Sequence, residues 1–197
     1  GVVMVPAGTF TFTQLSIPAN VLLVGKGRDV TILQSVVADK VVTIAGEKAG
    51  FSDLTLDGNS LQVGSIGVYM LAKNETTIEN ATVKRFRTGI HAQGGRRAQW
   101  NDLYVDNCYV GALLSGDING VAADGDEFRY NRWSGGRVTS CTSIGIHLQF
   151  VDRKCWHNSF SDIGFENNTG VAFKCTGARW TDLDGCWWVA NTGGDII

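Results

Sequence analysis

Apolar and polar residues alternate with a period of two along most of this chain. The alternation is clear in residues 53–56, 102–105 and 162–165, and it returns in residues 89–92 and 145–148. Successive side chains of a β-strand point to opposite faces, so this period predicts strands. The i, i+3, i+4 spacing of an amphipathic helix does not occur in these segments. We therefore expect an all-β chain of short strands that are separated by polar bends.

One short pattern occurs six times and orders these strands. Each copy begins with a bulky apolar residue, has Asp, Asn or Gly two positions later, and is followed by a Gly that opens a second apolar strand. The copies begin at Phe51, Ile78, Trp100, Trp133, Phe160 and Trp180, and the later glycines are Gly67, Gly89, Gly111, Gly145, Gly170 and Gly193. A unit of about 22 residues cannot bury its own apolar face, so the copies must stack on one another. The repeat predicts a parallel β-helix, a solenoid whose coils have about 22 residues each.

Stacking assigns each strand position to a column that faces inward or outward. The inward columns are expected to hold Val68, Ile90, Ala112, Ile146 and Val171, then Met70, Ala92, Leu114, Leu148 and Phe173. The outward columns are expected to hold Tyr69, His91, Leu113, His147 and Ala172, then Leu71, Gln93, Ser115, Gln149 and Lys174. Parallel strands lie about 4.8 Å apart, so the outward columns form a flat strip of side chains.

Other residues are placed by the same reasoning. The aromatic column of Trp100, Trp133, Phe160 and Trp180 is expected in the core. Trp187 and Trp188 are adjacent, so one of the two must face outward, where it could stack on a sugar or contact a subunit. Asn107 and Asn167 are expected in one bend column, because Asn tolerates the backbone of a turn.

Composition and charge narrow the classes of function. Seventeen Lys and Arg against 19 Asp and Glu give a formal charge of −2, which supports neither nucleic acid nor an anionic membrane as the main partner. No apolar run is long enough to span a bilayer. The five cysteines are an odd number, and Cys108 and Cys141 fall on neighbouring coils. We expect these two to be stacked buried thiols, with a disulfide as the alternative.

Residues 1–46 are less regular than the six coils expected in residues 47–197, and they carry a resemblance. The segments VMVPAGTF (3–10), IPANVLLVGKG (17–27), TIL (31–33) and FSDLTLDGN (51–59) resemble the opening coils of the pectate-lyase-like right-handed β-helix superfamily. The resemblance implies one right-handed parallel β-helix domain over residues 1–197. Members of that superfamily usually begin with a capping helix. Its absence here, with a last coil that also lacks a cap, predicts a fragment truncated at both ends.

The superfamily includes pectate and alginate lyases, polygalacturonases, mannuronan epimerases and bacteriophage tailspikes. The polygalacturonase signatures and the Asp-Pro-His of the epimerases do not occur in this sequence. The resemblance therefore favours a phage tailspike or tail fibre, located on the virion or outside the cell, with a homotrimer expected by resemblance only. The expected function is binding of a bacterial surface or uronate polysaccharide, and whether the chain also depolymerises it stays open. A secreted polysaccharide lyase, glycoside hydrolase or uronate epimerase is the alternative, and a structural spacer is the third.

An inserted loop at residues 116–128 is the first candidate for chemistry. It makes one coil longer than its neighbours and carries Asp124, Asp126 and Glu127, which we take as candidate catalytic acids. Asp124 and Asp126 flank a Gly and are also ordinary turn residues. If a lyase acted here, Ca²⁺ could neutralise the uronate carboxylate. No cofactor is otherwise expected, and no Cys and His arrangement has the spacing of a zinc site.

The outward strip is the second candidate. Its polar and aromatic side chains suit a sugar, and the predicted binding residues are Tyr69, His91, Gln93, His147, Gln149 and Arg137. His91 and His147 are two coils apart, roughly 9.6 Å by strand spacing, so they cannot act as a dyad. The alternative is that both are simply solvent-facing histidines.

Overall fold

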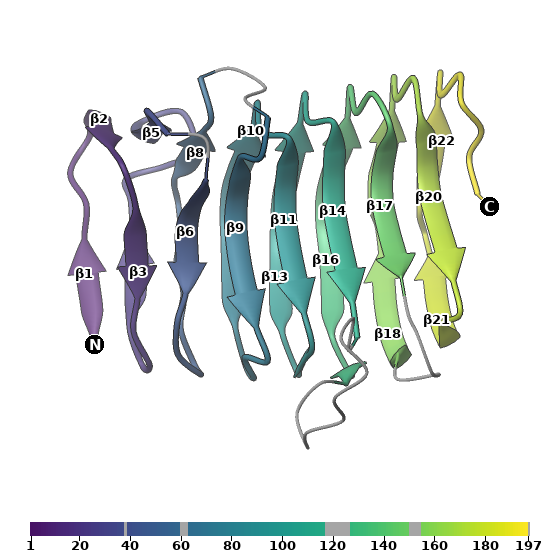
Figure 1. Ribbon diagram of the computed structural model, residues 1–197, viewed down its shortest axis with the longest axis horizontal. Helices are drawn as coiled ribbons and strands as arrows, with labels where there is room; N and C mark the ends of the chain where they lie inside the picture. Colours follow the sequence, from purple (N-terminus) through teal and green to yellow (C-terminus); the bar gives the residue numbers. More distant parts are fainter. Residues whose placement is uncertain (38, 60–62, 117–126, 150–154, 197) are drawn as a thin grey trace.

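The computed structural model describes residues 1–37, 39–59, 63–116, 127–149 and 155–196. Every pair of strands in this part of the chain is parallel, as the repeat predicts. The strands of successive coils lie side by side, and the two termini lie at opposite ends of the stack (Figure 1). The coils therefore stack along one axis and form a β-solenoid.

Within the described residues, the strands belong to two sheets, which we call sheet A and sheet B. Sheet B has seven strands: β3 (Leu15–Ile17), β6 (Lys40–Ile44), β9 (Ile66–Leu71), β11 (Thr88–Gln93), β14 (Val110–Ser115), β17 (Ile144–Gln149) and β20 (Val171–Thr176). Sheet A has fifteen: β1 (Val2–Met4), β2 (Gly8–Phe12), β4 (Leu22–Val24), β5 (Thr31–Ser35), β7 (Gly50–Ser52), β8 (Thr55–Asp57), β10 (Thr77–Lys84), β12 (Gly95–Arg96), β13 (Gln99–Asp106), β15 (Phe128–Arg129), β16 (Arg132–Thr139), β18 (Cys155–Ser161), β19 (Gly164–Glu166), β21 (Arg179–Asp184) and β22 (Trp187–Val189).

The Asp, Asn or Gly of the sequence repeat is a left-handed bend in sheet A. The bend residues have φ between 46° and 72°. Asp53, Asn80, Asp102, Gly135 and Asp162 are the bend residues that the repeat predicts, but in the last coil the bend is Gly185 and not Asp182, which lies within β21. Gly, Asn and Asp reach this conformation at the lowest cost, which explains why the repeat admits these residue types. Asp53, Asp162 and Gly185 lie between two short strands, whereas the other three bends lie within β10, β13 and β16, so sheet A wraps around two sides of the solenoid.

The inward columns are confirmed in the middle of the stack. Ile90, Ala112 and Ile146 are cross-strand partners and are fully buried. The prediction is wrong for the last coil, where Val171 pairs with Ile144 and Phe173 pairs with Ile146. Counting from Gly170 caused the error, because this glycine lies against the backbone of Ser143 and not at the position of the earlier glycines. Ala172 takes that position and is buried, although it was expected to face outward.

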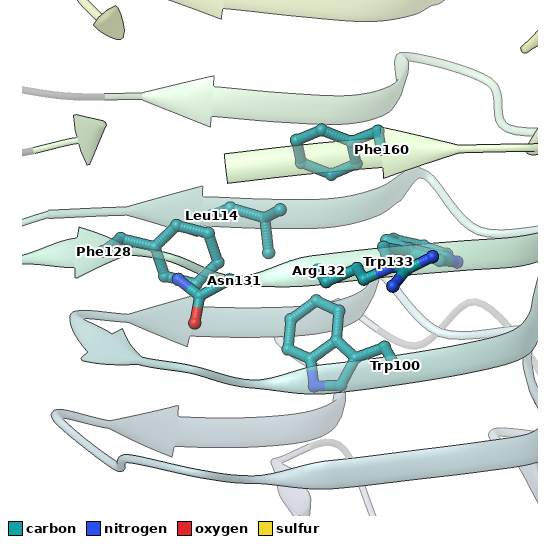
Figure 2. A pocket seen from close by; sticks show the side chains of 7 residues that line it. All are labelled: Trp100, Leu114, Phe128, Asn131, Arg132, Trp133 and Phe160. Atoms are coloured by element: carbon teal, nitrogen blue, oxygen red, sulfur yellow. The ribbon is translucent and has the colours of Figure 1, made fainter. Parts of the chain in front are cut away.

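The aromatic column is confirmed for three of its four members. Trp100, Trp133 and Phe160 stack in the core with ring centroids 5.7 and 6.5 Å apart (Figure 2). A void of only ≈ 10 Å³ lies among these rings, about the smallest space that holds one water. Trp180 is 59% exposed, and Leu183 is the partner of Phe160. In sequence, Trp180 resembles the apolar residue that begins each copy of the repeat. In the structure it lies at the corner of the coil that comes before that position.

Buried asparagines hydrogen-bond from one coil to the next. The Oδ1 of Asn158 accepts from the backbone N and the Nδ2 of Asn131 at 3.1 and 3.0 Å, and the Nδ2 of Asn158 donates to the carbonyl of Phe128. Asn168 and Asn191 form the same arrangement on another corner. These side chains satisfy backbone groups that leave the strand ladders at the bends.

Of the remaining predictions for single residues, two are confirmed and one is wrong. Cys108 and Cys141 are free and buried, as expected, and burial raises the pKa of Cys108 to about 12. Asn107 and Asn167 do share a column, with Ser140 between them, and all three have positive φ. Ser115 was expected to face outward but has 0% exposure, because its short side chain lies between the longer side chains of two neighbouring strands.

Candidate functional site

Five of the predicted binding residues lie together on the outer face of sheet B. Tyr69, His91, Leu113 and His147 are consecutive cross-strand partners, and Gln93 and Gln149 flank them on the same face. Tyr69 and His91 meet edge to face at 5.5 Å, and the Lys40 ammonium lies 4.0 Å from the Tyr69 ring. Leu113 separates the two histidines, in agreement with the expected spacing. The role of this strip in binding stays a prediction.

Both histidines of the strip are poor proton acceptors. Burial lowers the pKa of His91 below its ordinary value of 6.5, and Lys40 lowers it further. Burial also lowers the pKa of His147, with Lys174 as the neighbouring charge. Each imidazole is therefore neutral at pH 7. It can donate and accept hydrogen bonds but cannot form an ion pair with a carboxylate.

Of the three candidate catalytic acids, one can be placed. Asp124 and Asp126 lie outside the described residues. Glu127 accepts a hydrogen bond from Arg96, with its Oε2 3.2 Å from Arg96 Nη2, and forms an ion pair with Arg129, whose Nη1 is 2.9 Å from the same oxygen. These ion pairs tie the end of the inserted loop to the solenoid, so Glu127 has a structural role that the sequence did not indicate.

Arg137 does not lie with the other predicted binding residues. It is on β16, in the part of sheet A that follows the bend, and its side chain is 48% exposed. It lines a groove of ≈ 410 Å³ that crosses the outer face of β10, β13, β16 and β19. The groove is lined by Arg28, Asp29, Thr82, Lys84, Tyr104, Asp106, Arg137, Thr139 and Glu166. We call this surface the sheet A groove.

Arg28 closes one end of the sheet A groove. Its guanidinium lies 4.0 Å from the centre of the Tyr104 ring and 3.2 Å from the Asp102 carboxylate. Its carbonyl accepts a hydrogen bond from Thr55, two strands away from Tyr104. The Arg28 side chain therefore reaches across β10 and holds the Tyr104 ring in place.

Trp187 lies beside Glu166, the lining residue farthest along the stack, and continues the row of Tyr104 and Arg137 on the next coil. Its indole lies against Gly164, where an added Cβ would be 2.6 Å from the ring, and its Nε1 donates to Glu166 at 3.2 Å. Arg137 Nη1 donates to the second oxygen of Glu166 at 3.3 Å. Trp187 is 41% exposed, whereas Trp188 stacks inward on Phe165 at 4.3 Å. The expectation that one of the two tryptophans faces outward is confirmed.

The acids of the groove differ in their surroundings. Burial raises the pKa of Asp106 above its ordinary value of 3.8, although Lys84, the Asn107 N–H and Ser140 oppose the shift. Asp57 is buried at the edge of the same row. Its burial alone would raise its pKa, but hydrogen bonds from Arg85 and the Asn59 N–H give a net lowering. Asp106 therefore holds its proton to a higher pH than an ordinary carboxyl, and Asp57 is fixed by its ion pair.

The sequence missed most of this groove, although one signal for it was present. Alternation in residues 102–105 already points Tyr104 outward, with Arg137 as its cross-strand partner on the next coil. No pattern connects Arg28 to Asp102, because 74 residues separate them. Within the described residues, no three His, Cys, Asp or Glu side chains are grouped as a metal site would require. The described part of the chain also has no helix with the length and apolar character of a membrane span.

Comparisons with known proteins bear on the fold. Neither a family model nor a curated protein matches the sequence. The A-module of the Azotobacter vinelandii mannuronan C-5 epimerase AlgE4 is 13% identical with a TM-score of 0.52, over 98% of this chain and 70% of that one. Pectate lyase Pel9A is 13% identical with a TM-score of 0.56, over 90% of this chain and 54% of that one.

A phage protein is also among the similar structures. The Dettilon tailspike is 13% identical with a TM-score of 0.46, over 91% of this chain and 39% of the tailspike, which is too weak a likeness to support an argument. The identities to the epimerase and the lyase are low, so those likenesses show the fold alone. The chain folds as a right-handed parallel β-helix, as its repeat and its opening coils predict.

Proposed function

We propose that this domain binds an acidic polysaccharide, of the bacterial surface or uronate type, in the sheet A groove. The observation that carries the proposal is the order of side chains along the groove. Tyr104 and the half-exposed Arg137 line the groove, and Trp187 lies just beyond Glu166 in the same row. Aromatic rings accept the apolar faces of sugars, and a guanidinium pairs with a carboxylate through two hydrogen bonds.

The spacing of the groove suits an extended chain of sugars. Tyr104, Arg137 and Gly164 are on three successive strands, which lie about 4.8 Å apart. A polysaccharide lying across these strands would meet a ring, a cation and a second ring in turn. Lys84 in the neighbouring row supplies another cation for a second carboxylate. The groove lining holds three basic and three acidic side chains, so the choice of an acidic sugar rests on the positions of Arg137 and Lys84 and not on net charge.

Affinity measurements with matched variants test this proposal. Isothermal titration with an oligogalacturonate and with a neutral galactose oligomer should show preference for the acidic chain. Arg137→Ala should weaken binding of the acidic oligomer about tenfold or more, and Trp187→Ala should weaken both. Tyr69→Ala on sheet B is the control and should leave affinity unchanged. If Tyr69→Ala lowers affinity and Arg137→Ala does not, the strip on sheet B is the binding surface.

Inverting glycoside hydrolysis is a second candidate function. Asp106 and Glu166 lie in one outward row with Thr139 between them, so their strands are about 9.6 Å apart. Inverting enzymes place an acid and a base about 6.5–9.5 Å apart, with the acid held protonated. The raised pKa of Asp106 suits the acid, and Glu166 would activate water. New reducing ends that disappear in Asp106→Asn would support hydrolysis, whereas an unsaturated product absorbing in the ultraviolet would indicate a lyase.

The biological setting is proposed on the sequence alone. A phage tailspike or tail fibre remains our proposal, on the virion or outside the cell, because the polygalacturonase and epimerase signatures do not occur in the chain. A homotrimer goes with this setting and can be tested by light scattering. Failure of all acidic and neutral glycans on an array to bind, with no turnover, would favour the structural spacer.

A further inference from the structure

One corner of the solenoid carries large side chains at backbone positions that disfavour them. This corner joins the end of each sheet B strand to the next coil, along the lower edge of Figure 1. One residue per coil there has φ between 48° and 59°, and the column is Asn20, Lys48, Glu75, Arg97, Tyr130, His157 and Trp180. The left-handed conformation is unfavourable for most L-residues, and less so for Asn or Gly.

The contrast with the bend of sheet A shows that the backbone does not require these side chains. The same left-handed conformation recurs there, and every position is Asp, Asn or Gly. At the corner the column changes from charged residues to Tyr130, His157 and Trp180 over three successive coils. Bulky residues with positive φ are rare and mark functional positions. We therefore ask what these aromatic rings present to solvent.

The rings form a continuous stack on the surface. Tyr130 and His157 are 5.4 Å apart with an interplanar angle of 11°, and His157 and Trp180 are 5.1 Å apart at 22°. Trp156 lies beside His157 and also stacks on Trp180, at 6.0 Å and 11°. Tyr130 is 52% and Trp180 is 59% exposed. We call these four residues the corner stack.

Positive charge borders the corner stack. The Arg129 guanidinium lies 5.6 Å from the Tyr130 ring and 6.0 Å from the Trp156 ring. Arg129 and Arg96 share the single carboxylate of Glu127, which leaves one positive charge in excess within this group. The Nε atoms of both arginines and the Nε1 of Trp156 are buried and have no hydrogen-bond acceptor within the described chain. These three donors lie on successive coils, in the column next to the stack.

We propose that the corner stack, with Arg96 and Arg129, is a second carbohydrate site that takes an acidic sugar chain. Sugar rings would lie against Trp180 and Tyr130, and a sugar carboxylate would pair with Arg129. A protein partner fits less well, because a stable interface buries about 800 Å² on each side. This surface is narrow, since it follows a single corner column, to which each coil contributes one residue. A glycan chain can lie along such a column, since it needs only one ring or one cation from each coil.

The site is separate from the sheet A groove, so the two can be tested independently. The double variant Tyr130→Asn with Trp180→Asn removes two rings and keeps residues that the left-handed conformation favours. Its thermal unfolding should therefore match that of the unchanged protein. Titration with an oligogalacturonate should show two classes of site in the unchanged protein. In the corner variant, the affinity of one class of site should fall tenfold or more. In the groove variant Trp187→Ala, the affinity of the other class should fall.

The outcomes distinguish this inference from the proposed function. If Trp187→Ala has no effect and the corner variant loses binding, the corner site stands and the groove fails. If the corner variant binds oligogalacturonate as the unchanged protein does, the inference is overturned. It is also overturned if the corner variant changes only self-association in light scattering, because the partner is then a protein. In NMR, the indole N–H signals of Trp156 and Trp180 should shift on adding the oligomer to the unchanged protein.

Discussion

Trp187 lies flat against Gly164, its neighbour on the preceding coil, and donates its indole N–H to Glu166. Only a residue without a side chain leaves this space, since an added Cβ would come within 2.6 Å of the ring. The φ of Gly164 is not in the left-handed region, so its conformation is open to any residue. Gly164 is thus required by the position of the indole and not by the backbone.

Gly164→Ala should therefore displace the Trp187 ring without unfolding the domain. Trp187 is 41% exposed, so its side chain can swing into solvent. We expect affinity for an acidic oligosaccharide to fall about tenfold, or ~1.4 kcal/mol. In a double-mutant cycle, Gly164→Ala should add little to Trp187→Ala, because both remove the same contact. Full additivity of the two effects would contradict the positioning role of Gly164.

Asn158→Ala should destabilise the domain by about 2–4 kcal/mol, since it leaves several buried groups without partners. The backbone N of Asn131 loses its acceptor, and the carbonyl of Phe128 loses the bond donated by Asn158. The urea midpoint measures the change. Asn131→Ala should not be additive with it, because the two side chains share one hydrogen bond at 3.0 Å. Asn101, which is only partly buried, is the control and should tolerate Ala.

The stability of the domain should fall as the pH decreases through the range of histidine titration. His91 and His147 both have pKa values lowered from 6.5 in the folded state, so the unfolded chain binds more protons than the folded one near that pH. The free energy of unfolding therefore declines from about pH 7 downward and levels off below the folded pKa. Urea unfolding at a series of pH values measures this decline. It should be smaller in His91→Gln, and an equal decline in that variant would contradict the assignment.

The cysteines should differ in reactivity toward Ellman's reagent. Burial raises the pKa of Cys108 to about 12 and shields its sulfur, and Cys141 and Cys155 are also buried with raised pKa values. In the native protein Cys175 and Cys186 should react first, each forming a mixed disulfide and displacing thionitrobenzoate from the reagent, because these two are partly exposed. All five should react in denaturant. Rapid reaction of Cys108 in the native protein would show that the coils open locally.

The sequence predicted what depends on local alternation and failed where a glycine of the repeat takes a different place in the coil, as Gly170 does. Ile90, Ala112 and Ile146 were assigned correctly because their coils keep one register over three successive glycines. Val171 was assigned wrongly because the chain reaches its strand through a turn of different geometry. Trp180 was placed in the core because an apolar residue before a polar pair resembles a strand start. Only the left-handed backbone at the corner turns that side chain outward.

The candidate site was less predictable than the fold for a related reason. Arg137 was identified as outward, but the sequence did not show which of the outer faces it occupies. Glu127 was proposed as an acid without the two arginines that bind it, since Arg96 comes from an earlier coil. Arg28 contacts Asp102 across 74 residues of sequence. Contacts between coils depend on how far each side chain reaches, and single-sequence periodicity contains no such information.

The corner column has a consequence for how such a chain can change over time. Each coil contributes one residue to this column, and the strands on either side keep the same register whichever residue stands there. A duplicated or deleted coil would therefore lengthen or shorten the row of surface groups by one unit while the interior remained continuous. The order of side chains along the corner column can therefore change faster in evolution than the solenoid that carries them. The ligand that fits this column would change with that order.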